Sequence, residues 1–280
     1  MAGFTFAGIA TGLAGAALVL LGGLTGWSLL ARRRTQRHWR SLAGTAGSGR
    51  FGIEMIEGLP EPVQRYFRHS IAPGTPLAAS VELHMTGWIR LSRGARWMRL
   101  KAAEILAPPD GFVFTASTGG LLKISGADSY LNRNGSVAWR LFGIVPVARA
   151  SGPDVSRSAQ GRLAGELFLL PSALLPQRGV RWEALGDDTV RASFTVEGRA
   201  YQLTLGLQPG GAPGSVEVNR WGNVETEGGA FREIAFGGAL AEPRTFGGYT
   251  IPTRIAAGWR PGSDSFFEFF RIEGLSAAYR

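Results

Sequence analysis

The sequence predicts an α+β protein that consists mainly of antiparallel β strands and is preceded by one transmembrane helix. From Leu77 onward, apolar and polar residues alternate with the period of two that is typical of strands, in about a dozen segments with turns roughly every 8–12 residues. Residues 4–31 contain no charged side chain, and five arginines follow in the next nine residues. Strand and helix patterns do not alternate along the chain, which argues against a doubly wound parallel sheet.

The uncharged segment predicts a membrane attachment. A helix of about 20 apolar residues crosses the hydrocarbon core, so residues 4–31 are long enough to span it. The segment lacks the basic start and the cleavage site of a secretory signal peptide, which favours a retained anchor. We therefore expect residues 1–40 to form a transmembrane helix with a basic juxtamembrane collar. The arginines of this collar are Arg32, Arg33, Arg34, Arg37 and Arg40.

The collar also predicts the orientation of the chain. The positive-inside rule places the arginines, and the globular domain behind them, in the cytoplasm. The alternative is a periplasmic or otherwise extracytoplasmic domain. The small-residue spacings Gly8-x-x-x-Gly12 and Gly22-x-x-x-Gly26 could let two such helices approach closely and form a homodimer, although glycine is common in membrane helices in any case.

Composition and motifs argue against several function classes. The formal net charge is +9, but the collar supplies five of these charges, and the remaining +4 (9 − 5) form no basic run beyond residue 50. This distribution is not typical of nucleic-acid binding. The chain has no cysteine, which excludes disulfides, thiolate nucleophiles and iron–sulfur ligation. Phosphate-binding glycine loops, H-E-x-x-H and G-x-S-x-G are absent from the sequence, so we expect no metal and no cofactor.

Two helices are expected beside the strands. Residues 41–50 (SLAGTAGSGR) are small and polar, which predicts a linker and leaves 51–280 for the β domain. Prolines early in LPEPVQRYFRHSI (59–71) and its apolar spacing predict a short helix. A second helix is expected over 155–170, with Asp154 as its N-cap, because Pro171 stops the pattern.

The expected strands share alternating patterns, and two of the turns between them carry strong signals. Asn134-Gly135 and Glu197-Gly198 each predict a hairpin turn. The expected strands are 81–91, 96–106, 111–117, 121–125, 128–132, 136–143, 179–185, 189–196, 199–207, 215–221, 231–237, 248–259 and 265–275.

Four phrases of the sequence resemble an uncharacterised family of bacterial proteins of unknown function. They are PEPVQRYFRHSI (60–71), the run from Trp97 through PPDGF (108–112), GRLAGELFLLPSALLP (161–176) and TFGGYTIPTRIAAGW (245–259). The resemblance covers roughly residues 50–280 and implies no activity. The strand pattern is also similar to the curved half-barrel of periplasmic lipoprotein carriers and related lipid-binding proteins, whose sheet wraps around a helix-plugged apolar cavity. This similarity implies a curved half-barrel sheet partly filled by helices.

The aromatic residues suggest where a ligand could bind. The segment FFEFFRI (266–272) is apolar on both faces, so core must cover one face and a helix, a ligand or membrane the other. Arg162 and Glu166 stand four residues apart on the expected second helix; they either form a surface ion pair or hold a ligand headgroup at the concave face. The expected ligand-binding residues are Trp97, Arg162, Glu166, Trp221, Tyr249 and Trp259.

Together these patterns favour a membrane-anchored, non-catalytic binder of lipid or of another apolar ligand. No residue is assigned a catalytic role. One alternative is an enzyme acting on a membrane-derived apolar substrate, with Glu82, Glu104 or Glu166 as the acid–base group. The other alternative is an assembly partner of a membrane protein that acts through the glycine-rich helix.

The collar leads to a prediction about topology. If the arginines govern insertion, a reporter that fluoresces only in the cytoplasm will be bright when fused after Arg280. An alkaline phosphatase fused at the same site will be inactive. The opposite pattern would place the domain outside the cytoplasm.

Overall fold

The computed structural model describes residues 25–26, 29–44, 47–120, 123–224 and 229–280. Most of the expected transmembrane helix therefore lies outside the described residues, as do both small-residue spacings except for Gly26. Within the described part of the chain, no helix combines the length and the apolar character needed to cross a bilayer.

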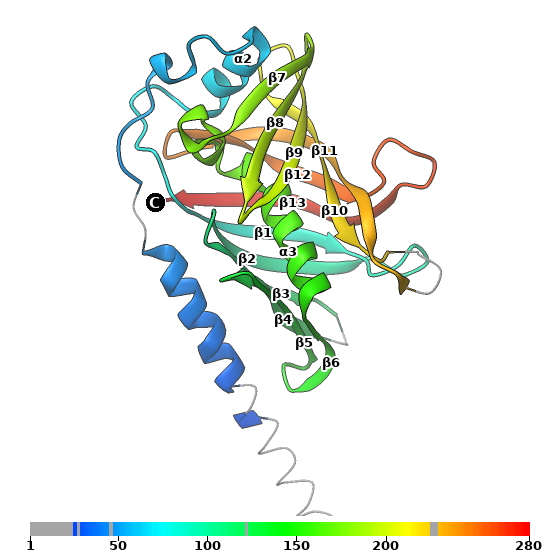
Figure 1. Ribbon diagram of the computed structural model, residues 1–280. Helices are drawn as coiled ribbons and strands as arrows, with labels where there is room; N and C mark the ends of the chain where they lie inside the picture. Colours follow the sequence, from blue (N-terminus) through cyan, green and yellow to red (C-terminus); the bar gives the residue numbers. More distant parts are fainter. Residues whose placement is uncertain (1–24, 27–28, 45–46, 121–122, 225–228) are drawn as a thin grey trace, which may run out of the picture.

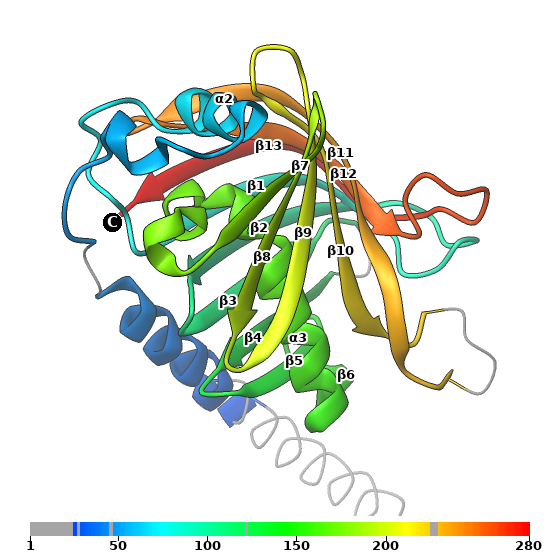
Figure 2. The same cartoon turned by 45° about the horizontal axis from the view of Figure 1, so that its top comes forward.

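One strongly curved antiparallel sheet dominates the described residues, as the sequence predicted (Figures 1 and 2). Its thirteen strands follow the order β6-β5-β4-β3-β2-β1-β13-β12-β11-β10-β9-β8-β7. All neighbours in this order are also neighbours along the chain except β1 and β13, whose pairing joins the two wings of the sheet. The strands are β1 (Val81–Ile89), β2 (Met98–Ala107), β3 (Gly111–Thr118), β4 (Ile124–Leu131), β5 (Asn134–Leu141), β6 (Val145–Ser151), β7 (Arg181–Gly186), β8 (Thr189–Val196), β9 (Arg199–Leu207), β10 (Pro213–Gly222), β11 (Arg232–Phe246), β12 (Tyr249–Trp259) and β13 (Phe267–Tyr279).

Both expected helices exist, but the second is shorter than the sequence suggested. Helix α2 spans Glu61–Ser70, and α3 spans Pro153–Gly165. Asp154 does not cap α3: the N-cap is Gly152, and the Asp154 carboxylate instead accepts a hydrogen bond from the Trp221 indole. After α3 the chain continues in the 3₁₀ turns η2 (Leu167–Leu169), η3 (Pro171–Leu174) and η4 (Pro176–Arg178); η1 (Ile53–Ile56) precedes α2.

The region of β4 to β6 differs from the expectation in three ways. Residues expected as two strands, 121–125 and 128–132, contribute to the single strand β4. The turn that follows is formed by Asn132 and Arg133, both with positive φ, and not by Asn134-Gly135. Strand β6 was not predicted, because all of its residues are exposed and its sequence has no apolar alternation.

Gly135 has a packing role in place of the expected turn role. A Cβ atom there would lie 2.7 Å from the Cα atom of Ser156 on α3. The Gly135 amide also donates a hydrogen bond to the Ser156 hydroxyl over 2.9 Å. Because Gly135 has no side chain, α3 can pack directly against β5.

Helices fill much of the concave side of the sheet. Helix α3 packs against β5 on one wing and β10 on the other, and Figure 2 shows it inside the curve. The 3₁₀ segment after it buries Leu167, Leu170 and Leu174 in the main core. Helix α2 packs against β7, β8 and β12 and adds Tyr66 and Phe67 to that core. The helix-filled curved sheet agrees with the predicted architecture.

A further helix, residues 29–43, packs on the opposite, convex face. Leu42 is only 3% exposed and contacts a small cluster with Ile105 of β2 and Val113 of β3. The Trp39 indole donates a hydrogen bond to Glu82 of β1 over 3.1 Å. The helix continues to residue 43, so the first three residues of the expected linker are helical.

Leu42→Ala should loosen the docking of this helix. Removing a buried leucine side chain costs about 2 kcal/mol or more, because the apolar contacts are lost and the space is not refilled. Leu30→Ala is the matched control, since Leu30 belongs to the same helix and is 60% exposed. We expect the control to change the free energy of unfolding by less than about 0.5 kcal/mol. Equal effects of the two variants in urea titrations would show that the helix does not pack on the sheet.

Candidate functional site

Five charged side chains meet on the concave side of the sheet. We call them the interior charge cluster. They come from both wings and from the helix between them: Glu104 (β2), Asp128 (β4), Arg162 (α3), Glu166 (which ends α3) and Arg220 (β10).

Arg162 is the centre of this cluster. Its Nη2 lies 2.8 Å from Oε1 of Glu104, and its Nε lies 2.8 Å from Oε1 of Glu166. Its Nη1 lies 3.6 Å from Oδ2 of Asp128. The guanidinium also lies over two β3 rings, with its Cζ atom 4.8 Å from the Phe112 centroid and 4.3 Å from that of Phe114. Such charge-assisted and cation–π contacts fix the guanidinium in one orientation.

The cluster is protected from water to different degrees. The Glu104 side chain is 2% exposed, whereas that of Asp128 is 26% exposed. Burial raises the pKa of Glu104 well above its ordinary value; Arg162 opposes this effect, and the nearby Glu166 and Asp128 carboxylates add to it. Burial also raises the pKa of Asp128, although Arg162 and the Trp139 indole, which donates to it over 2.8 Å, work in the other direction. Glu104 thus tends to keep its proton.

Arg162 itself remains a cation. Burial would lower the pKa of its guanidinium, but the Glu104, Glu166 and Asp128 carboxylates outweigh burial and raise it. Arg162 is therefore a fully compensated charge.

Arg220 has a different environment. Its Cζ lies 4.6 Å from the Phe236 centroid and 5.2 Å from the Trp259 ring, and its Nε is buried without a hydrogen bond. Within the described part of the chain, it forms neither an ion pair nor a hydrogen bond. Burial, with the neighbouring Arg162 charge, lowers its pKa to about 10, so it is still charged at neutral pH. Arg220 is therefore a cation held against aromatic rings without a counter-ion.

Helix α3 positions both arginines. Gly161 faces Arg220 so closely that a Cβ atom there would lie 3.0 Å from the Arg220 Cγ. The next residue, Arg162, then points to the other wing of the sheet. A side chain at position 161 would require Arg220 to shift by roughly a few tenths of an ångström.

The structure separates the residues that the sequence grouped as one site. Arg162 and Glu166 belong to the interior charge cluster, and Trp259 contacts Arg220. Trp221 lies against the start of α3, with the Arg157 guanidinium 3.5 Å from its ring. Trp221 thus lies beside Arg157, whose guanidinium forms an ion pair with the Glu233 carboxylate over 2.6 Å.

Trp97 and Tyr249 make other contacts. Trp97 lies just before β2, with the guanidinium of Arg90 4.8 Å from its ring. Tyr249 is buried and stacks on Tyr279, and its hydroxyl donates to the Pro76 carbonyl and accepts from the Ala78 amide. Tyr249 thereby ties the segment before β1 to β12.

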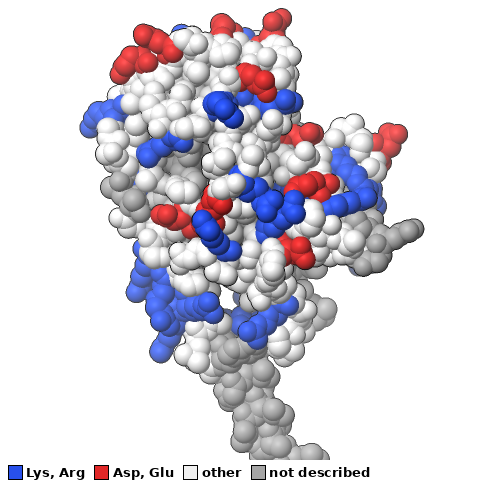
Figure 3. All heavy atoms as spheres, in the orientation of Figure 1, with Lys and Arg blue, Asp and Glu red and all other residues white. Residues whose placement is uncertain are grey.

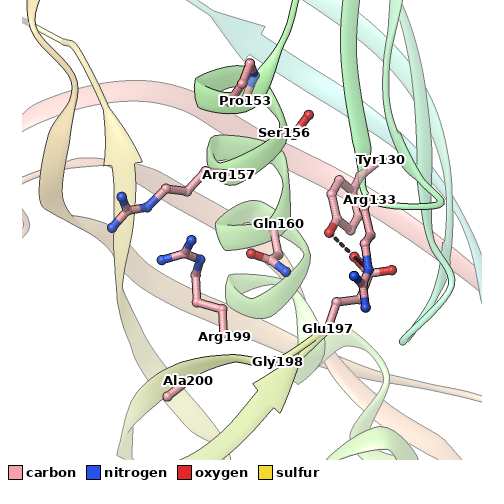
Figure 4. A pocket seen from close by; sticks show the side chains of 10 residues that line it. All are labelled: Tyr130, Arg133, Pro153, Ser156, Arg157, Gln160, Glu197, Gly198, Arg199 and Ala200. Atoms are coloured by element: carbon pink, nitrogen blue, oxygen red, sulfur yellow. Dashed lines mark hydrogen bonds and ion pairs between the residues drawn. The ribbon is translucent and has the colours of Figure 1, made fainter.

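An open cavity of about 530 Å³ lies beside the N-terminal half of α3 (Figure 4). Arg157 and Arg199 extend to the same side of it, whereas Arg133 lies with Glu197 and Tyr130. The Tyr130 hydroxyl donates to the Glu197 carboxylate, and Arg133 approaches the same carboxylate at 3.8 Å. This cavity is polar and open, unlike the aromatic surroundings of Arg220.

The structure also shows the surroundings of Glu82, Glu104 and Glu166, the acid–base groups of the enzyme alternative. Glu82 binds Trp39 and lies 3.0 Å from Arg280. Glu104 and Glu166 both contact Arg162. In the described residues, no group of three or more His, Asp or Glu side chains is arranged to hold a metal ion.

Sequence reasoning missed Asp128 and Arg220, although the sequence carries a signal for both. Arg220 is in phase with Val216 and Val218, which are buried on β10. Asp128 is in phase with the buried Tyr130 on β4. A charged residue in register with inward-facing apolar residues is the pattern that indicates such a site.

Comparison with known proteins identifies the family. A sequence model described as a family of unknown function, DUF6544, matches residues 49–272. The chain belongs to this family. The resemblance to an uncharacterised family is thereby confirmed. No curated protein matches the sequence.

Among solved structures, the chain is similar to a crystal structure described as an outer membrane lipoprotein-sorting protein domain from Vibrio parahaemolyticus. The TM-score is 0.36 at 10% identity, and the match covers 82% of this chain and 92% of that chain. A likeness at this score carries no argument about function.

Glu104→Gln should flatten the pH dependence of stability. Because the pKa of Glu104 is raised on folding, the folded state binds this proton more tightly than the unfolded chain does. The resulting stabilisation is complete below the ordinary pKa and is lost as the pH rises through the folded-state pKa, at up to about 1.4 kcal/mol per pH unit. The amide has no proton to lose, so the free energy of unfolding of the variant will fall less between weakly acidic and alkaline pH.

The control for this measurement is Glu242→Gln, which changes an exposed carboxylate paired with Arg254. Urea titrations across the same pH range should give this control the slope of the unaltered protein. Parallel curves for Glu104→Gln and the unaltered protein would contradict proton retention by Glu104.

Proposed function

We propose that this protein is a membrane-anchored, non-catalytic binder of a lipid or another apolar ligand, and that an anionic group of the ligand binds Arg220. The uncharged segment 4–31 supports the anchoring part of the proposal. The collar favours a cytoplasmic domain, and the extracytoplasmic arrangement remains the alternative.

The uncompensated charge of Arg220 carries the proposal. Arg220 is half-buried, and its Nε is enclosed without a hydrogen bond, so part of its charge has lost contact with water without gaining a partner. Glu166 and Asp128 act to raise the pKa of Arg220, but burial and the Arg162 charge outweigh them, and it is Arg162 that holds the three acidic side chains, at 2.8–3.6 Å. A ligand carboxylate or phosphate would supply the missing counter-ion.

The surroundings of Arg220 suit the apolar part of such a ligand. Phe236 and Trp259 pack edge to face at 5.0 Å, and Phe270 lies 6.2 Å from Phe236. Phe236 and Phe270 are only partly buried, so their rings retain surface that a hydrocarbon chain can cover. Apolar walls with a single orienting polar group are typical of sites for amphipathic ligands.

The enzyme alternative has one observation in its favour, the raised pKa of Glu104. A general acid must reach its substrate, however, and Glu104 is 2% exposed with Oε1 bound to Arg162. Its environment therefore explains the pKa without a reaction. The assembly-partner alternative depends on the glycine-rich segment, which lies almost entirely outside the described residues.

Arg220→Met should separate ligand binding from stability. Binding of a fluorescent fatty acid should weaken by about tenfold or more, because a charge-assisted contact contributes about 1.5–3 kcal/mol. The methyl ester of the same probe should bind both proteins alike, since it has no charge. The melting temperature should not fall, because the variant removes an uncompensated cation and keeps an apolar side chain of similar length.

Arg254→Met provides the control, since Arg254 is an exposed arginine on β12, paired with Glu242. This variant should bind the fatty acid as the unaltered protein does. The proposal fails if the unaltered protein does not prefer the acid to its ester, or if Arg220→Met retains that preference.

A further inference from the structure

We propose that the β5–β6 hairpin forms, together with the start of the N-terminal helix, a second membrane contact that docks on anionic lipid. This contact is independent of the ligand site at Arg220. It consists of an apolar tip and a basic surround, and it is made by the folded domain in addition to the expected membrane segment. We call it the hairpin face; its apolar residues are Phe142, Val145 and Val147, and it adjoins Leu29 and Leu30 at the end of the expected membrane segment.

The first observation is the distribution of exposed apolar side chains. Seven large apolar residues are exposed in the described chain; three of them belong to the hairpin face, and two, Leu29 and Leu30, to the adjoining end of the expected membrane segment. The other two lie elsewhere, Leu91 in the loop after β1 and Leu185 on β7. Single exposed apolar residues are ordinary, but a gathering of most of them in two adjoining segments indicates an interaction surface.

The two segments adjoin in space. A Cβ atom placed on Gly143, in the turn of the hairpin, would lie 2.8 Å from an Arg32 guanidinium nitrogen. Burial lowers the pKa of Arg140, and the charges of Arg32 and Arg149 lower it further. The three arginines are therefore close enough to repel one another electrostatically. The hairpin tip thus meets the helix where the uncharged segment 4–31 ends.

The conformation of the tip is the second observation. Phe142 has φ of 52° and is 56% exposed. A bulky residue rarely adopts positive φ, and glycine would fit this position with less strain. The Phe142 ring is therefore exposed at the end of the hairpin, although packing within the protein gives no reason for an aromatic residue there.

The charge around the hairpin face indicates which surface it contacts. Residues 29–44 and 138–150 contain no Asp or Glu, yet they contain seven arginines. Figure 3 shows Lys and Arg atoms over the N-terminal helix, at the lower left, and no Asp or Glu atoms in the lower part of that view. A basic surround with an apolar tip matches the interface of an anionic bilayer, in which basic groups meet lipid phosphates and apolar side chains enter the boundary of the acyl region.

The absence of cysteine from the sequence makes a direct test simple. The full chain carrying Val145→Cys, labelled with an environment-sensitive fluorophore, would be added to vesicles of phosphatidylcholine with phosphatidylglycerol and a spin-labelled quencher lipid. We expect a blue shift and strong quenching. The matched control is Leu185→Cys on β7, which is similarly exposed and should be neither shifted nor quenched.

Two further variants distinguish docking from mere proximity to the tether. With the label at Val145, Phe142→Ser combined with Val147→Ser should reduce quenching to the level of Leu185→Cys. Arg149→Gln should weaken docking by about fivefold, and only on vesicles that contain phosphatidylglycerol. Because Phe142 and Val147 are exposed, the melting temperature of the double variant should be unchanged.

Three results would overturn the proposal. One is a chain that does not associate with these vesicles, and another is equal quenching at Val145 and Leu185. The third is unchanged quenching in the Phe142→Ser, Val147→Ser variant, which would show that the tether alone brings the hairpin close.

Discussion

The ion pairs of Arg162 hold the interior of this sheet together. An open curved sheet has no inherent reason to keep its two wings at a fixed separation, because only the β1–β13 pairing joins them. Helix α3 spans the gap by packing on β5 and β10, and Arg162 binds it to Glu104 on β2. Loss of the Glu104–Arg162 contact would leave a buried polar group without its partner, so the wing, the helix and the cluster depend on one another.

The same arrangement explains why Arg220 is left without a counter-ion. Burial raises the pKa of Glu104 and that of Asp128, so these two acidic side chains resist ionisation. Asp128 and Glu166 both lie against Arg162. Gly161 brings Arg220 close to the helix without giving it a polar partner. The placement of these side chains, and not their number, gives Arg220 its proposed role in binding an anionic group.

Much of the fold could be predicted from the sequence because strand alternation and turn signals are local. The Glu197-Gly198 turn and α2 lie where the pattern placed them. The site could not be predicted in the same way, because Glu104 and Arg162 are 58 residues apart and only the fold brings them together. Gly135 shows the limit of local rules: its sequence context favours a turn, but the approach of α3 decides its role.

The ligand site and the hairpin face belong to connected elements. Strand β5 carries Trp139, whose indole binds Asp128 of the interior charge cluster, and the same strand ends at Leu141, directly before Phe142 at the tip of the hairpin. Strand β6 leads back, through Gly152, into α3, which carries Arg162. The tip is therefore connected along β5 to Trp139, which contacts the cluster, and along β6 to the helix that carries Arg162. The fold can hold the proposed ligand site near a bilayer without a hinge or a second domain.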